Sequence, residues 1–268
     1  MIDDPQALFV RVDSWFHPTA LTTGPWRPDA MHGGPPSALL GWGIGRALEP
    51  GEHVARVNID LERPVQLVPL TPVVTRRQVS RRVAHLEVQL RTSSEVMASA
   101  RAVVLRGRPV PAAIVNGLDD AVPVAGPELR VVPPDPLHHA PVVFHRDAVE
   151  HRFLSGGFEV SGPSISWLRL IYPVVEGEPT TGLCHLLALA DFGSAISQTI
   201  VPESGLGMIN VDVSVALGRT PLGPWIGLDA MGAVNADGVG LAVTELRDRA
   251  GRVGVATQAQ LAQPYGAG

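Results

Sequence analysis

The chain has 268 residues, of which 45% are hydrophobic and 18% charged, and its formal net charge is -5. This composition is ordinary for a folded protein and excludes a disordered or fibrous chain. Lys and Arg are scattered rather than gathered into the basic stripe that binds phosphate backbones, so no nucleic-acid partner is expected. The N-terminus lacks a signal-peptide pattern, and no window reaches the roughly 18 apolar residues of a membrane span. We therefore expect a cytoplasmic protein with no membrane span.

The first half of the chain reads as a helix followed by four strands. Short strands are predicted near 8–12 and 20–23, and an apolar helix follows from His32-Gly33-Gly34 to Leu48. The residue pattern then predicts four strands, at 54–61, 72–79, 84–90 and 96–105. Because the helix is apolar nearly all round, it cannot lie on a surface with one face in water. We expect it to be enclosed by the sheet.

A proline-rich segment separates this unit from a second one of the same plan. Eight prolines lie between Gly107 and Pro141, and proline fixes φ and removes a hydrogen-bond donor. The second unit then repeats the order: short strands near 148–153 and 164–171, a helix at 181–198, and strands at 208–217, 225–234, 240–246 and 253–261. The predicted domains are 1–107 and 142–268, with 108–141 as the linker.

The two predicted helices differ in one acidic residue. The first contains no carboxylate before Glu49, whereas the second carries Asp191 among aliphatic residues, and the counterpart of Asp191 in the first helix is about Gly41. The single cysteine, Cys184, lies in the same apolar run and is predicted to be buried. A repeated plan with one unmatched acid indicates a single site between the two halves.

The order of several short motifs resembles one known family. These motifs are His32-Gly33-Gly34, Arg63-Pro64, Ala190-Asp191, the run from Asn210 to Ser214, Arg219-Thr220-Pro221, Trp225, Asp237-Gly238, and the run from Asp248 to Gln258. Over almost its whole length the chain is similar to the double-hotdog acyl-CoA thioesterases, including bacterial thioesterase II and its actinobacterial relatives. The resemblance implies an α+β fold of two tandem hotdogs, each a curled antiparallel sheet around a central helix.

The resemblance also implies an activity and a site. The activity is hydrolysis of acyl-CoA to free acid and CoA, at one active site per chain between the halves. In the family an acid, a Thr or Ser and a Gln hold the hydrolytic water, and these match Asp191, Ser214 and Gln258. The family's Arg-Pro after the strand reads Arg219-Thr220-Pro221 here, a departure that bears on the register of Ser214. Asn210 is interpreted as a strand-start residue.

The residues themselves suggest how such chemistry would proceed. Asp191 can act as general base or as nucleophile, and its apolar neighbours are predicted to raise its pKa. Backbone N–H groups of Gly33 and Gly34 at a helix N-terminus can donate to an oxyanion, since a residue without Cβ lets substrate approach. His32 either contacts substrate or caps the Gly-Gly turn. No cofactor and no metal are expected.

Several alternatives stay open. Asp191 can be a helix cap, Ser214 a small polar filler, and Gln258 a solvent-facing strand residue. The protein can be a non-catalytic acyl-CoA or lipid-binding module. A hotdog dehydratase is disfavoured, because no histidine follows Asp191. The arginines at 76–77 and 81–82 form either a solvated face or a contact for coenzyme A phosphates. The chain can also form a homo-oligomer.

Overall fold

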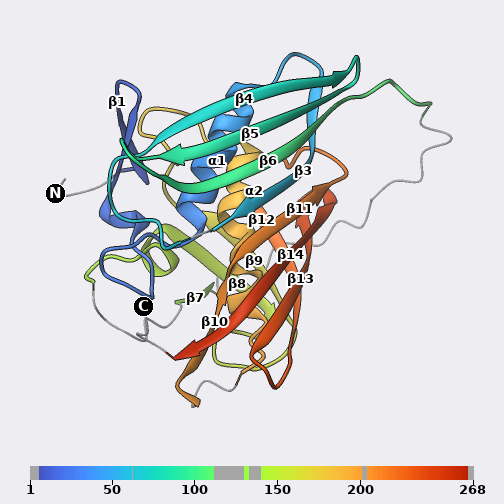
Figure 1. Cartoon of the computed structure of the whole chain (residues 1–268). Helices are drawn as coiled ribbons and strands as arrows, with labels where there is room; N and C mark the ends of the chain where they lie inside the picture. The colour runs from blue at the N-terminus through green and yellow to red at the C-terminus, as the bar shows by residue number, and fades with distance from the viewer. Residues whose placement is uncertain (1–5, 62, 112–129, 133–139, 201–203, 265–268) are drawn as a thin grey trace.

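The computed structural model describes residues 6–61, 63–111, 130–132, 140–200 and 204–264. Within these ranges twelve strands form one long sheet, which curves around the helices, and two further strands form a small separate sheet (Figure 1). The small sheet pairs β1 (Phe9–Val12) with β2 (Trp15–Pro18). The strands of the long sheet are β3 (Glu52–Asp60), β4 (Thr71–Ser80), β5 (Val83–Arg91), β6 (Val96–Arg106), β7 (Arg130–Val131), β8 (Val149–Ser155), β9 (Ser164–Leu170), β10 (Leu206–Asn210), β11 (Asp212–Leu217), β12 (Trp225–Val234), β13 (Val239–Asp248) and β14 (Gly251–Pro264).

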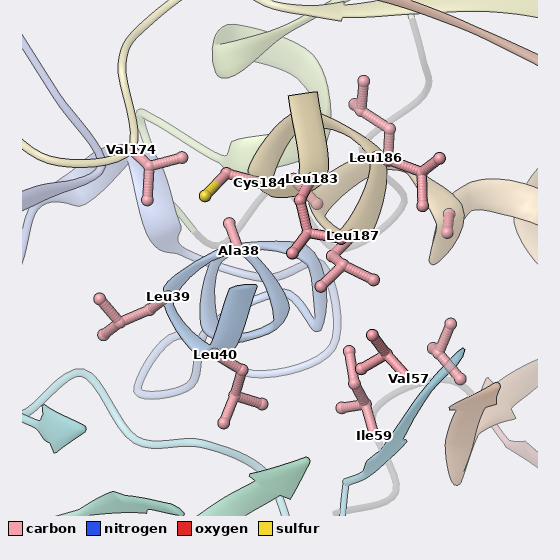
Figure 2. Close-up of a cluster of buried hydrophobic side chains, with 14 of the residues drawn as sticks. Ala38, Leu39, Leu40, Val57, Ile59, Val174, Leu183, Cys184, Leu186 and Leu187 are labelled. Atoms are coloured by element: carbon pink, nitrogen blue, oxygen red, sulfur yellow. The ribbon is translucent and has the colours of Figure 1, made fainter. Parts of the chain in front are cut away.

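Two apolar helices lie side by side inside the curve of the sheet. Helix α1 (Gly34–Arg46) packs against β4, β5 and β6, while α2 (Gly182–Ala190) packs against β9 and β12 and also along α1. Figure 2 shows Leu183 and Leu187 of α2 pointing toward α1 and Ala38 of α1 pointing toward α2, while Leu40 points away from α2. Leu40 and Leu187 are both fully buried. The Cβ that an alanine would add at Gly41 would come 3.0 Å from Leu187 Cδ1, so the glycine lets the two helices approach closely. Within α1, residues 34–41, 43 and 44 are buried, and in α2 all residues except Gly182 and His185 are buried.

The two halves share their sheet through one antiparallel pair. Strand β3 of the first half pairs with β11 of the second, with Asn58 opposite Ser214. Across this seam the Asn58 amide donates to the Ser214 hydroxyl at 2.8 Å, and the same hydroxyl donates to Asp212 at 3.0 Å. Asp212 in turn accepts from the backbone N–H of Ala259 in β14, at 2.6 Å. This chain of hydrogen bonds ties together three adjacent strands from both halves.

Three predicted elements differ from the structure. The predicted strand at 20–23 is a 3-10 turn, Ala20–Thr22, in which the Thr22 hydroxyl and N–H bond back to the Thr19 carbonyl, and the second short strand is β2. The predicted strand at 208–217 breaks into β10 and β11, with Val211 between them. The predicted helix at 181–198 ends at Ala190, and a short helix α3 (Phe192–Ile196) continues from Asp191.

Most of the predicted linker, 112–129 and 133–139, lies outside the described residues. Between these gaps β7 pairs with β8, so part of the segment is a strand. Cys184 is buried as predicted, and burial raises the pKa of its thiol. Among the described residues no helix has the length and hydropathy needed to span a membrane.

Candidate active site

The break between α2 and α3 places Asp191 at the meeting point of the two halves. Its main-chain carbonyl accepts hydrogen bonds from the Gln258 side chain at 2.9 Å and from the Asn210 side chain at 3.1 Å. Carbonyls at a helix C-terminus lack helical partners, so these two amides stabilise the break. Gly193 is needed there as well, because an added Cβ would lie 2.2 Å from Thr244 Oγ1 and 2.8 Å from Gln258 Oε1.

Each carboxylate oxygen of Asp191 has one close nitrogen neighbour. Asn210 Nδ2 donates to Oδ1 at 2.8 Å, and His32 Nδ1 lies 3.1 Å from Oδ2. The side chain of Asp191 is 7% exposed. Burial alone would raise the pKa of Asp191, but the hydrogen bonds and charge of His32, with the bond from Asn210, outweigh burial and lower the pKa below its ordinary value. The prediction of a raised pKa was wrong, because it counted the apolar neighbours and missed both donors.

The Gly-Gly turn at the start of α1 packs closely against this carboxylate. An added Cβ at Gly33 would lie 2.7 Å from Asp191 Oδ2, and one at Gly34 would lie 2.5 Å from the Ala188 carbonyl. Residues 35 and 36 are both proline and offer no N–H, so Gly33 and Gly34 supply the amides of this turn. The Gly34 N–H donates to His32 Nδ1 at 3.0 Å. The Gly33 N–H has no hydrogen bond to any described residue.

The structure brings some of the expected site residues together and separates others. His32, Gly33 and Asp191 lie in one cluster, joined by Asn210. The hydrogen bonds of Ser214 go to Asn58 and Asp212, away from Asp191. The contact of Gln258 is with the main chain of Asp191, and its Oε1 is buried without a hydrogen bond among the described residues.

Strand geometry explains why Ser214 points elsewhere. Val213 and Val215 are buried in the core, so the intervening Ser214 lies on the opposite face of β11. The break at Val211 changes the phase of the alternation, and Asn210 on β10 therefore reaches Asp191. Asn210 is the first residue of the Asn210-Val211-Asp212 run, but the prediction of one continuous strand at 208–217 hid its contact with Asp191.

A cavity of about 420 Å³ opens beside the cluster. Its polar wall contains His32, Asp191, Asn210 and Ser194. Apolar side chains form much of the rest, namely Pro25, Trp26, Ala30, Met31, Leu61, Pro64, Val65, Ala195, Met208, Ile209 and Val211. An apolar cavity with a few convergent polar groups is typical of a small-molecule site.

Three of the four arginines considered for coenzyme A phosphates, Arg76, Arg77 and Arg82, have partners within the protein. Arg76 donates to Glu52 from both guanidinium nitrogens, at 2.7 and 3.0 Å, and Arg77 contacts His85 at 2.9 Å. Two other arginines, Arg27 and Arg63, line the cavity beside Asp191. The arginines that line the candidate cavity are therefore Arg27 and Arg63, and not the predicted pairs at 76–77 and 81–82.

Comparison with solved structures identifies the fold class. The chain is similar to a hotdog-fold protein of unknown function from Alicyclobacillus acidocaldarius (16% identity, TM-score 0.70, covering 96% of this chain and 97% of the other). A putative thioesterase from Novosphingobium aromaticivorans is 22% identical (TM-score 0.66, covering 95% and 98%). An acyl-CoA thioesterase II from Mycobacterium marinum is 16% identical (TM-score 0.63, covering 94% and 93%). This is a hotdog-fold protein.

Family models narrow the class further. Residues 22–106 match the acyl-CoA thioesterase N-terminal domain, and residues 120–262 match the acyl-CoA thioesterase C-terminal domain. The chain belongs to the acyl-CoA thioesterase family. A comparison with curated proteins gives no match.

Proposed function

We propose that this protein hydrolyses acyl-CoA thioesters with a water activated by Asp191, at one site between two tandem hotdog halves. The proposal is carried by one arrangement: a buried carboxylate with His32 and Asn210 each contacting one oxygen, on the wall of a cavity that Gly33 also lines. The N–H of Gly33 has no hydrogen bond to any described residue. Family membership supplies the substrate class, an acyl-CoA.

The carboxylate has room to bind a water. An ionised carboxylate has about four acceptor positions, and His32 and Asn210 occupy one each. The lowered pKa of Asp191 keeps it ionised at neutral pH, where it can accept a proton. A water held on a remaining position would face the cavity, where the thioester carbonyl would be placed.

Hydrolysis then proceeds at this site through attack by the water, departure of the thiol and two proton transfers. The water oxygen attacks the carbonyl carbon while Asp191 takes a proton from the water. The Gly33 N–H donates to the carbonyl oxygen as it gains negative charge. The carbon–sulfur bond breaks, and the proton passes from Asp191 to the leaving sulfur, which gives the free acid and the thiol of coenzyme A.

In this scheme Asn210 takes the place expected for Ser214 beside the carboxylate, and Gln258 acts on the backbone of Asp191. Asn210 bonds both the carboxylate and the carbonyl of Asp191, which fixes the rotamer of the acid. We propose that the Gln258 side chain fixes the position of the α2–α3 break by donating to the main-chain carbonyl of Asp191.

A second candidate is favoured by the contact between His32 and Asp191. The argument against a dehydratase was that no histidine follows Asp191, but the first half supplies one at 3.1 Å. An imidazole and a carboxyl group at one acyl site can remove a Cα proton from a 3-hydroxyacyl thioester and protonate the departing hydroxide. The products would be water and a 2-enoyl thioester, with the thioester intact.

One assay separates these functions from each other and from simple binding. Acyl-CoAs from C2 to C18, with 3-hydroxyacyl-CoAs added, are incubated with the protein while free thiol and enoyl-thioester absorbance are both recorded. We expect thiol release without enoyl formation. Enoyl formation without thiol would identify a dehydratase, and tight binding without either product would identify a binding module.

A further inference from the structure

His32 Nδ1 lies within hydrogen-bond distance of two groups that make opposite demands. The Gly34 N–H, at 3.0 Å, needs an acceptor, whereas the Asp191 carboxylate, at 3.1 Å, needs a donor. A ring nitrogen of histidine either carries a proton and donates or has a lone pair and accepts. The two contacts therefore belong to two different protonation states of one nitrogen.

We propose that His32 is a positioning residue whose Nδ1 carries a proton and donates a hydrogen bond to the catalytic carboxylate, which holds that carboxylate in place. With a proton on Nδ1, His32 donates to Asp191, and the Gly34 N–H loses this acceptor. Without that proton, Nδ1 accepts from Gly34, and its lone pair faces the carboxylate. This inference rests on the proposed hydrolysis and adds a role to His32 distinct from substrate contact.

The surroundings of the ring favour the state with the proton on Nδ1. The side chains of His32 and Asp191 are 11% and 7% exposed, and an uncompensated contact between a lone pair and a carboxylate is costly in such a place. Phe144 and Phe192 lie against the imidazole, with ring centroids 5.0 and 4.9 Å away. They hold the ring in one orientation and keep Nδ1 aimed at both partners.

Other titratable groups near His32 are few among the described residues. His145, on the π-turn Phe144–Ala148, stacks on His32 with centroids 6.2 Å apart. On the cavity wall, Arg27 is paired with Asp29 at 2.9 Å and Arg63 with Glu95 at 3.0 Å. Asp191 is the acid in direct contact with the imidazole, so the state of Nδ1 should follow the state of Asp191.

The ring state can be measured without any substrate. Nitrogen-15 NMR of the labelled full chain distinguishes a protonated from a bare Nδ1, and His32→Asn assigns the signal. We expect a protonated Nδ1 at neutral pH, and in Asp191→Ala we expect it to become the bare, accepting form. A bare Nδ1 with a proton on Nε2 in the parent protein would overturn the proposal.

The second test measures the activity of three variants, two of which place an amide nitrogen near one of the two ring nitrogens of His32. Asn at position 32 places an amide N–H near the site of Nδ1, Gln places one near Nε2, and Ala places none. We expect kcat to fall about 100-fold in His32→Ala and His32→Gln, with His32→Asn within about tenfold of the parent. Equal kcat in all three, or an effect on KM alone, would contradict the positioning role.

Two controls separate this inference from the proposed function. Thermal unfolding of each variant shows whether the fold is kept, and Asp191→Asn is assayed alongside. If the parent releases thiol and Asp191→Asn does not, but His32→Ala retains the parent kcat, only the inference fails. If the parent itself releases no thiol, hydrolysis fails, and the NMR measurement still decides the state of His32.

Discussion

His32 and Asp191 come from opposite halves of the chain, and their side chains meet at 3.1 Å between His32 Nδ1 and Asp191 Oδ2. His32 precedes α1, and Asp191 follows α2, so the packing of the two helices against each other sets this distance. Gly33 permits the approach, because a side chain there would occupy the space of the carboxylate. Neither half holds the pair by itself.

The pH dependence of hydrolysis follows from the state of Asp191. His32 and Asn210 lower the pKa of Asp191 despite its burial, and the base is active when ionised. Activity should therefore be present above the folded-state pKa and be lost as pH falls through it, below the ordinary aspartate value of about 3.9. The test is kcat/KM against pH, with circular dichroism to confirm folding. An acidic limb near pH 6 in a folded protein would contradict this expectation.

The lowered pKa of Asp191 also predicts how the free energy of unfolding depends on pH. A carboxylate with a lowered pKa in the folded state stabilises the fold fully above its unfolded pKa, and this contribution is lost as pH falls through the folded value. The free-energy difference between the parent and Asp191→Asn should be largest near neutral pH and should shrink below about pH 4. Urea unfolding at several pH values measures it. A difference that grows toward acid would mean that the folded-state pKa is raised.

The glycines of α1 and its turn provide a matched pair of substitutions. Gly33→Ala would put a Cβ 2.7 Å from Asp191 Oδ2, and a carboxylate displaced by this contact should cost about 100-fold in kcat. Gly45→Ala meets nothing within 4 Å and should stabilise the helix by roughly 1 kcal/mol with activity unchanged. Thiol release and thermal unfolding of both variants test this. Parent-level activity in Gly33→Ala would show that the carboxylate is not needed in its present place.

Substitutions of Asn210 and Ser214 should differ in effect, the first lowering activity and the second lowering stability. Asn210→Ala removes a donor from Asp191 Oδ1 and should lower kcat about 100-fold. Ser214→Ala leaves the Asn58 amide without its partner at the seam, so it should lower the free energy of unfolding by about 1 kcal/mol while kcat stays near the parent value. The assay is again thiol release, with urea unfolding. A large loss of kcat in a stable Ser214→Ala protein would restore the original role of Ser214.

Much of the fold was predictable, because apolar helices and β-rich segments leave strong local patterns. The burial of α1 was expected from its apolar surface, and the burial of Cys184 from the apolar run around it. Hydrophobic pattern cannot show a one-residue break in a strand. The interruption at Val211 depends on how β10 and β11 each pair with β14, which involves residues far along the chain.

The candidate site was predictable in part for the same reason. Asp191 and the Gly-Gly turn stand out because an acid among aliphatics and a glycine pair before prolines are locally unusual. The role of Asn210 and the contact of Gln258 with a main-chain carbonyl depend on the α2–α3 break and on strand phase. These are tertiary relationships, and the spacing of motifs alone does not contain them.

The most direct test of the account is the rate of thiol release from acyl-CoA by Asp191→Asn, compared with the parent protein at neutral pH. Asparagine keeps the size of the side chain, so thermal unfolding should confirm a folded variant, but its amide is not a base. We predict a loss of at least about 100-fold in kcat for every acyl-CoA that the parent hydrolyses. A folded Asp191→Asn protein that releases thiol at the parent rate would contradict the assignment of Asp191 as the base.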